Sequence, residues 1–416
     1  MRRSLVLLLL PMFAHAADTA RAPKEQTLGK KQETTLDTSL AGDITRKKED
    51  TGGAPLEYDQ FRLGVERQVS DKRKDQIESL RKIIELSPDQ KETPDLLFRL
   101  GELYFEESRD YFFQANRKDD DLIRALQTKD VAAQEKAKKE KATLLVGRDA
   151  YARLAVDQYT QIIQRYKDYP RTDEVLYFLG HNLMDLGEEK KGLVAYRKLI
   201  ETYPKSRFVP DAHLAFGEYY FNNSKGKREF LTRALQSYQA AASFPESSIY
   251  GFALYKQGWC YFNLTDYARA MDMFKAVVLY GEFTGASTLE KQGGAKGKNT
   301  LIREARADYV RAYERAGRRP EEAKENFSTV ASNPDDRFAM MEMLAGLYYD
   351  AGKDREAALA YNFLIKEKPL VAKTPGWQSR IVDCVLRAGD KKQHRTFIAQ
   401  YKIGSKHRRM TLGNVA

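Results

Sequence analysis

One pattern recurs along this chain: a small residue stands three positions before a large one. The small residue is found at five places: Gly101, Gly180, Gly217, Gly258 and Ala345. The large residue that follows is, in the same order, Tyr104, Leu183, Tyr220, Tyr261 and Tyr348. Self-similarity of this kind predicts stacked copies of one supersecondary unit, because no copy can bury its apolar face alone.

Two copies show the pattern in full, at 173–204 and 338–369. In the first copy, Gly192 provides a second small position, where two helices can approach closely. Gly187 marks the turn between the helices, and Pro204 ends the second helix because proline cannot continue one. Each copy is therefore predicted to be a helix–turn–helix pair.

These offsets resemble the tetratricopeptide repeat (TPR), a helix–turn–helix unit of 34 residues. The resemblance covers residues 56–401 and implies an all-α fold, a TPR-type α-solenoid in which the repeats form a right-handed superhelix. Less regular copies lie at 94–106, 210–245 and 303–334, and 377–401 resembles a degenerate terminal pair. The resemblance is nearly silent on function, since TPR units serve many unrelated systems.

Residues 1–16 have the features of a secretory signal peptide. Arg2 and Arg3 are basic, Leu5–Leu10 are apolar, and Ala14–Ala16 form a small-residue cleavage site. The apolar run is too short to span a membrane. We expect cleavage after Ala16, a periplasmic location and no direct insertion into the membrane.

The chain is basic, with a formal net charge of +11 at pH 7. Loss of Arg2 and Arg3 with the signal peptide would leave +9. No nucleic-acid-binding motif accompanies this charge, so we expect no nucleic-acid partner. The charge more simply favours solubility, acidic partners or anionic envelope surfaces.

The sequence predicts three regions after the signal peptide. Residues 17–55 are polar and lack aromatics, which predicts a disordered arm. The solenoid follows at 56–401 and holds a densely charged helical insertion at 106–150 and a Gly/Lys-rich loop at 281–300. Residues 402–416 form a flexible basic tail. The insertion is interpreted as a docking arm or, alternatively, as two overlong solvated helices.

No constellation of residues predicts catalysis. The histidines do not pair at metal-ligand spacing, and no Cys/His cluster has zinc spacing. Gly297-Lys298 lacks the other residues of a phosphate-binding loop, since Gln292 and Asn299 occupy the required positions. Cys260 and Cys384, two repeats apart, are too distant for a disulfide and are expected to be buried thiols. We therefore predict a protein that is not an enzyme and has no cofactor and no metal.

The TPR resemblance also implies which residues bind a partner, because the first helix of each repeat lines the concave groove. The positions that contact ligands in the family carry over to these residues: Tyr177, His181, Phe221, Asn222, Tyr255, Trp259, Phe262, Asn263, Arg311 and Tyr349. Aromatic residues suit interface hot spots, and Asn amides can pair with a peptide backbone. The alternative is that some of these aromatics pack in the core.

The predicted function is a non-catalytic adaptor or scaffold that binds envelope proteins through this aromatic groove. The junctions Tyr169-Pro170 and Tyr203-Pro204 resemble periplasmic TPR proteins of outer-membrane assembly and Tol-Pal-associated families. The layout of signal, arm, repeats and insertion resembles periplasmic TPR components of deltaproteobacterial gliding-motility machinery. A holdase-like chaperone and a regulator of a cell-wall enzyme are the alternatives. The sequence leaves the oligomeric state open.

Overall fold

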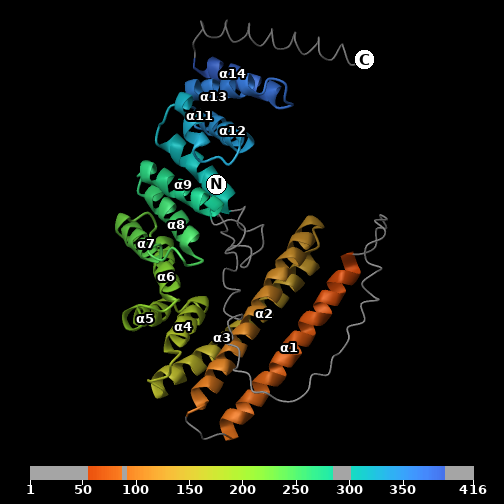
Figure 1. The fold of residues 1–416 in the computed structure, drawn as a ribbon. Coiled ribbons are helices and arrows are strands. Elements are labelled where there is room, and N and C mark those ends of the chain that lie inside the picture. Colours follow the sequence, from red (N-terminus) through yellow and green to blue (C-terminus); the bar gives the residue numbers. More distant parts are fainter. Residues whose placement is uncertain (1–54, 87–90, 284–300, 389–416) are drawn as a thin grey trace, which may run out of the picture. The chain divides into compact units, whose positions relative to one another are not determined.

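The computed structural model describes residues 55–86, 91–283 and 301–388, with side-chain surroundings given from Gln68 onward. Within these ranges the chain forms α-helices and no strand, so the all-α prediction is confirmed (Figure 1). It divides into two compact units, with described residues between 55 and 206 and between 207 and 388. The predicted signal peptide, the arm before Pro55, most of the loop at 281–300 and the tail at 402–416 lie outside the described residues.

The first unit contains a long helical hairpin flanked by other helices. Its elements are α1 (Pro55–Leu86), α2 (Thr93–Gln127), α3 (Val131–Arg165), α4 (Thr172–Asp185) and α5 (Glu189–Thr202). The hairpin is α2 and α3, each of 35 residues, and the insertion predicted at 106–150 lies within these two helices. The turn between them contains Lys129 with a positive φ of 56°, and Asp130 caps α3 by accepting a hydrogen bond from Ala133 N.

The second unit is a series of helical pairs stacked in chain order (Figure 1). Its elements are α6 (Val209–Asn222), α7 (Arg228–Ala241), α8 (Tyr250–Asn263), α9 (Tyr267–Phe283), the helical residues 301–315, α11 (Pro320–Ser328), α12 (Pro334–Asp350), α13 (Asp354–Glu367) and α14 (Thr374–Arg387). Residues 281–283, predicted as the start of the Gly/Lys-rich loop, instead belong to α9, which continues to Phe283. Gly281 is buried there, where a Cβ would lie 2.7 Å from Ile302.

The small residues of the repeat pattern allow an aromatic ring to pack directly on the partner helix. A Cβ built on Gly258 would lie 2.5 Å from Phe274, and one on Gly180 would lie 2.7 Å from Tyr196. Real Cβ atoms do not approach so closely, so each glycine is required by packing rather than by backbone conformation. This contact explains why a small residue recurs at the same position of the first helices.

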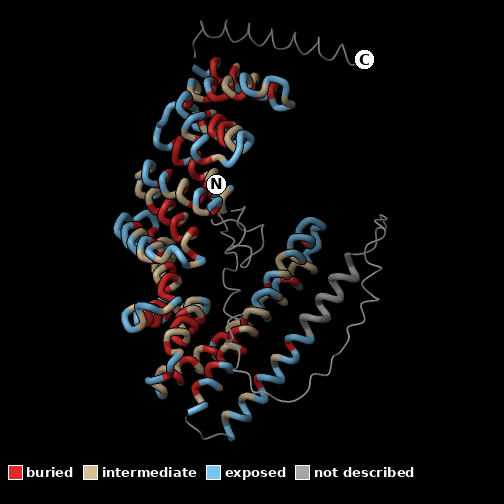
Figure 2. Tube along the Cα trace, viewed as in Figure 1, coloured by how far each residue is buried: buried red, intermediate tan, exposed pale blue. Residues whose placement is uncertain are grey.

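The same contact opens the long hairpin, where a Cβ on Gly101 would lie 2.6 Å from Tyr159. Beyond it, α2 meets α3 at alternating intervals of three and four residues, the spacing of an antiparallel coiled coil. The residues of α2 at this spacing are Tyr104, Ser108, Tyr111, Ala115, Lys118, Leu122 and Ala125. The small buried residues Ala115, Ala125 and Ala137 let the helices pack closely. Figure 2 shows that the distal hairpin is otherwise half-buried or exposed.

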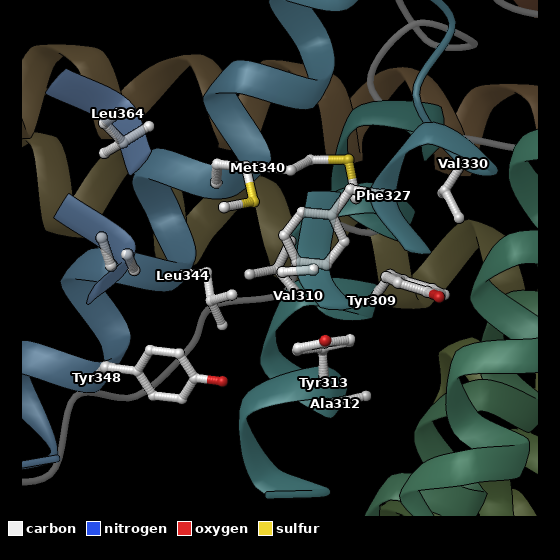
Figure 3. Packing of buried hydrophobic residues seen from close by; sticks show 14 of the residues in the cluster. Tyr309, Val310, Ala312, Tyr313, Phe327, Val330, Met340, Leu344, Tyr348 and Leu364 are labelled. Carbon is white, nitrogen blue, oxygen red and sulfur yellow. The ribbon is translucent and has the colours of Figure 1, made fainter. Parts of the chain in front are cut away.

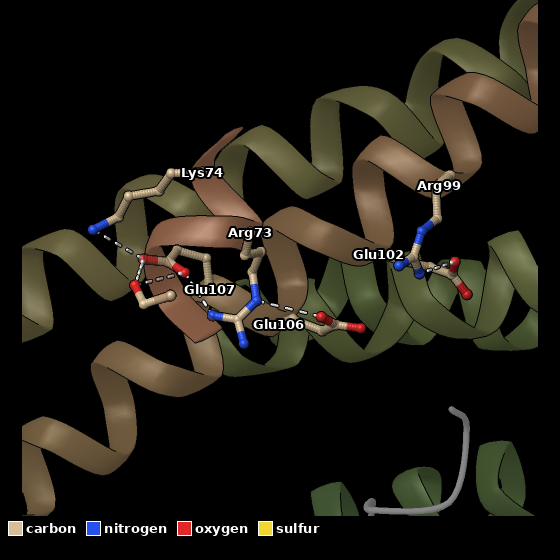
Figure 4. A network of polar contacts seen from close by, with 7 residues as sticks. Arg73, Lys74, Arg99, Glu102, Glu106 and Glu107 are labelled. Atoms are coloured by element: carbon tan, nitrogen blue, oxygen red, sulfur yellow. Dashed lines mark hydrogen bonds and ion pairs between the residues drawn. The ribbon is translucent and has the colours of Figure 1, made fainter. Parts of the chain in front are cut away.

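Helix α1 is attached to α2 through a buried carboxylate (Figure 4). Glu107 is 1% exposed, and its Oε2 accepts a hydrogen bond from Arg73 Nη1 at 2.6 Å. Ser70 Oγ donates to the same carboxylate at 3.2 Å, and Lys74 Nζ lies 3.8 Å from it. A buried charge is tolerated only when it is paired in this way, so Glu107 fixes the register of α1 on α2.

The largest core of the second unit runs from α8 to α14 and is continuous across its helical pairs. Figure 3 shows its middle, where Phe327 packs against Tyr313 with ring centroids 5.1 Å apart. Val310, which stands where the repeat pattern calls for glycine, is fully buried. Leu344 and Tyr348 extend the core into α12. Because each pair packs on the next, the core supports a regular surface on the first helices.

Candidate partner-binding surface

The surface residues predicted on α8 lie at its C-terminal half. Trp259 and Phe262 are half-buried, and their ring centroids are 5.3 Å apart. Trp259 also meets Phe274 of α9 edge-on at 6.1 Å, and Phe262 meets Tyr267 at 5.3 Å. Both rings are therefore anchored by the core on one side and keep part of their surface accessible. That arrangement suits an interface anchor, which must be rigid before binding.

A buried carboxylate, Asp308, organises three of the predicted residues. Tyr255 Oη donates a hydrogen bond to Asp308 Oδ2 at 2.7 Å, and Arg311 forms an ion pair with Oδ1. The nearby Trp259 side chain also favours the charged form of this carboxylate. Burial nevertheless raises the pKa of Asp308 above its ordinary value. Tyr255 and Arg311 are thus partners of Asp308, and their predicted contact with a ligand stays a prediction.

A second buried ion pair joins α6 to α8. Lys256 is 4% exposed, and its Nζ lies 2.9 Å from Glu218 Oε1. Tyr238 Oη of α7 donates to the same carboxylate at 2.8 Å. The Lys256 ammonium also lies 5.1 Å and 5.5 Å from the ring centroids of Phe252 and Phe221. We call the half-buried residues Phe221, Phe252, Trp259 and Phe262 the aromatic strip.

Two predicted asparagines lie at the ends of the helices that carry the aromatic strip. Asn222 and Asn263 are both exposed, at the last residue of α6 and of α8. Asn263 Nδ2 donates to the Trp259 carbonyl at 2.8 Å. This bond fixes the orientation of the amide, whose oxygen is an acceptor for a partner's N–H group.

The predicted residues of the first unit are less accessible. Tyr177 is buried and packs on Phe178 and Tyr196, with centroids 5.3 Å and 6.2 Å apart, so it is a core residue rather than a surface anchor. His181 is half-buried, with its ring 5.3 Å from Phe105 of α2 and its Nδ1 3.6 Å from Asp185. The long helix α2 thus covers part of the face that sequence position assigns to a ligand.

Tyr349 of α12 is surrounded by side chains of α14. Its Oη donates to Asp383 at 3.3 Å, and the Arg387 guanidinium lies 4.3 Å from its ring centroid. Arg380 lies 5.1 Å from the same ring. Cation–π contacts of this kind hold the ring in place. Tyr349 therefore joins α12 to α14, a role that its position in the repeat does not reveal.

The two cysteines are buried thiols in separate helices. Burial raises the pKa of Cys260 to about 12 and that of Cys384 above its ordinary value. A thiol with a raised pKa is a poor nucleophile. The described ranges contain no group of three or more His, Cys, Asp or Glu residues that could hold a metal ion. None of the helices described is long and apolar enough to cross a membrane.

Asp308 and Lys256, which organise this surface with Glu218, were not singled out from the sequence; the repeat offsets place Glu218 at a groove position but do not reveal its ion pair. Each lies on the first helix of a pair, where charged residues are usually solvated. One sequence feature could have indicated a buried charge on α8: Lys256 and Gln257 interrupt a segment that is otherwise mainly apolar and aromatic. A lysine surrounded by aromatics on a first helix needs a buried acid, and Glu218 supplies it.

Comparisons with known proteins find one tetratricopeptide repeat in this chain and several helical-repeat proteins of low similarity. The family model for the tetratricopeptide repeat matches residues 252–280, which span α8 and most of α9. A tetratricopeptide repeat protein from Parabacteroides merdae is 15% identical, over 60% of this chain and 92% of that one, with a TM-score of 0.33. The C-terminal part of a TPR repeat-containing protein from Cytophaga hutchinsonii is 14% identical, over 67% and 98%, with a TM-score of 0.31. No curated protein matches the sequence.

Proposed function

From the tetratricopeptide repeat at 252–280 and the all-α, TPR-type solenoid that contains it, we propose that this protein is a non-catalytic scaffold for protein partners. The observation that carries the proposal is the aromatic strip, which the core anchors from behind and leaves partly accessible in front. Interface energy concentrates on such rigid aromatic anchors. TPR units generally bind proteins, and this strip gives a chemical reason for where binding occurs.

The buried charges beneath the strip prepare it for binding. The Lys256–Glu218 pair holds α6 on α8, and Asp308 holds Tyr255 beside Trp259. The rings are therefore ordered before a partner arrives, which lowers the entropic cost of association. A partner segment would pack its apolar side chains on the strip and use Asn222 and Asn263 for backbone hydrogen bonds.

We further propose that the scaffold works in the periplasm, within a multiprotein machine of the cell envelope. The support is the signal-peptide pattern at residues 1–16 and the Tyr-Pro junctions after Asp168 and Thr202. Gliding motility and outer-membrane assembly are the two processes whose TPR components this layout resembles. The helical insertion at 106–150 offers a further surface, which is taken up below.

A crosslinking pull-down from the native envelope tests the scaffold proposal. The variant Phe262→Ala/Asn263→Ala removes one ring of the strip and its neighbouring amide. The matched control is Asn362→Ala/Phe363→Ala, which removes the same residue types from α13. We expect a defined set of envelope proteins with the wild type and the control, and its loss with the strip variant. Retention of the whole set by the strip variant would place docking elsewhere, and weak capture of many unrelated chains would favour a holdase.

Trp259 needs a milder substitution than Phe262. Its ring packs on Phe274 and against the core of the second unit, so truncation to alanine would also weaken the fold. Trp259→Phe keeps an aromatic ring on Phe274 and removes the indole N–H group and part of the contact area. We expect Trp259→Phe to weaken partner binding by about 1 kcal/mol while the melting temperature changes little.

A further inference from the structure

The distal part of the α2–α3 hairpin exposes large apolar side chains where no other described helix covers them. These residues, which we call the distal face, are Phe112, Ile123, Leu126, Val131 and Val146. Each is between 40% and 70% exposed. Large apolar side chains exposed together on one helical pair mark a candidate interaction surface.

The distal face continues the side of the hairpin on which α4 and α5 pack. Phe112 stands seven residues after Phe105, whose ring lies 5.3 Å from His181 of α4. Val146 stands seven residues before Arg153, whose Nη1 lies 3.0 Å from Glu188 at the start of α5. Residues seven apart lie on one side of a coiled-coil helix. Helix α4, which covers this side, ends at Asp185, whereas the exposed apolar residues of the hairpin continue beyond it toward the α2–α3 turn.

A charged layer lies at the centre of the distal face. Lys118 Nζ is 2.8 Å from Glu140 Oε2, and Lys141 Nζ is 2.5 Å from Asp119 Oδ1. These two acids and two bases carry no net charge. Phe112 precedes Asp119 by seven residues, and Leu126 follows it by seven. Along α2, the distal face therefore has an apolar residue seven positions before the charged layer and another seven positions after it.

We propose that the distal face binds a second copy of this chain, hairpin against hairpin in antiparallel orientation. A two-fold axis through the charged layer brings Phe112 of each copy beside Leu126 of the other, and Val146 to the level of the first turn of α3, where Val131 lies. The charged layer meets its own copy as a neutral quartet of acid–base pairs. A foreign helix would need no such symmetric spacing, whereas an isologous interface requires self-complementarity.

The space available on the hairpin fits this arrangement. The hairpin beyond Arg109 contributes 18 residues of α2, or about 27 Å of helix. In the antiparallel pair, the α2–α3 turn of each copy lies opposite the part of the partner's hairpin that is just distal to the end of the partner's α4. Helix α4 of neither copy therefore obstructs the contact. Two helices of this length bury roughly 1,000 Å² in total, which is at the lower limit for a specific interface. We therefore expect a dissociation constant on the order of 10 µM.

Sedimentation equilibrium of the purified chain tests the proposal. The weight-average mass should rise with concentration from 47.7 kDa toward twice that value. Val146→Glu should raise the dissociation constant at least about tenfold by placing a charge in the apolar layer. The matched control is Val194→Glu on α5, because Val194 is 67% exposed and Val146 is 70% exposed. The control should leave the dissociation constant unchanged, and circular dichroism should show equal helix content in both variants.

Disulfide trapping tests the orientation. A mixture of Phe112→Cys and Leu126→Cys chains should form a mixed disulfide dimer under mild oxidation, while either variant alone should crosslink much less. The native thiols do not interfere, since both are buried. A chain that stays monomeric throughout the concentration series would overturn the proposal. So would a dimer that Val146→Glu and Val194→Glu weaken equally, or one that crosslinks Phe112→Cys only to itself.

Discussion

The α2–α3 hairpin and the α8–α9 pair begin with the same contact and then differ in length. In each, a glycine of the first helix lies under an aromatic ring of the second: Gly101 under Tyr159, and Gly258 under Phe274. The two residues are 16 positions apart in the repeat and 58 apart in the hairpin. The comparison teaches that the contact defines the unit, and that the connection between its helices can be extended without changing it.

The extension changes what holds the helices together. In α8–α9, large apolar residues such as Phe274 and Val277 fill the gap between the helices and the next pair. In the distal hairpin no next pair follows, and alanines and charge pairs replace the large residues. The repeat thus stacks on its neighbours, while the hairpin projects apolar and charged side chains that no other described helix covers.

The largest expected effect comes from deleting the aromatic ring in each region. Phe274→Ala and Tyr159→Ala should each lower the free energy of unfolding by about 3–5 kcal/mol, because both rings are fully buried and leave a cavity. Urea denaturation followed by circular dichroism measures both. A small loss at Tyr159 with a large loss at Phe274 would break the claim that the two contacts are equivalent.

Substitution of the glycine in this contact should lower stability by less than removal of the ring does. Gly258→Ala should cost about 1–3 kcal/mol, because the added methyl group would overlap Phe274. Gly346→Ala is the matched control, since a Cβ there meets nothing within 4 Å and α12 is a helix interior. The control should gain about 0.5–1 kcal/mol from helix propensity. Thermal unfolding of the two variants should therefore shift in opposite directions.

The hydroxyl groups of the two buried tyrosines sharpen the comparison further. Tyr238 donates to Glu218 at 2.8 Å, so Tyr238→Phe should cost about 1.5 kcal/mol. Tyr159 Oη has no hydrogen-bond partner among the described residues, so Tyr159→Phe should stabilise the hairpin by about 1 kcal/mol. Denaturant midpoints measure both changes. A destabilised Tyr159→Phe chain would show that this hydroxyl has a partner after all.

The smallest expected change in stability comes from a buried acid and depends on pH. Burial raises the pKa of Asp211 in α6 to about 6, whereas the Glu107 carboxylate of the first unit is paired with Arg73. A raised pKa means that the folded state binds this proton more tightly than the unfolded state. The protonated Asp211 therefore adds its full contribution to folding stability below about pH 4, and this contribution is lost as the pH rises through about 6. Asp211→Asn should be about 1 kcal/mol more stable than wild type at pH 7 and should differ least near pH 4. A constant difference across this range would contradict the assignment.

The sequence alone predicted the helical pairs, because each depends on a local pattern of glycine and aromatic residues. It could not predict which first-helix aromatics are accessible. Tyr177 and Tyr255 occupy the same position of their repeats, but one is buried in the core and the other donates to Asp308. Asp308 comes from the irregular copy after residue 300, so its contact with α8 is a tertiary fact that repeat offsets do not contain. The coiled-coil spacing of α2 is present in the sequence, and charged residues at 118–121 obscure it.

Site-specific photocrosslinking tests the central claim most directly. A photoreactive phenylalanine analogue is placed at Asn263, beside the aromatic strip, or at Gln236, which is exposed on the second helix α7. The account predicts that the Asn263 probe forms a defined crosslinked product with an envelope protein and that the Gln236 probe does not. Crosslinking of the same protein from Gln236 but not from Asn263 would contradict the claim that the first-helix surface of α6 and α8 holds the partner.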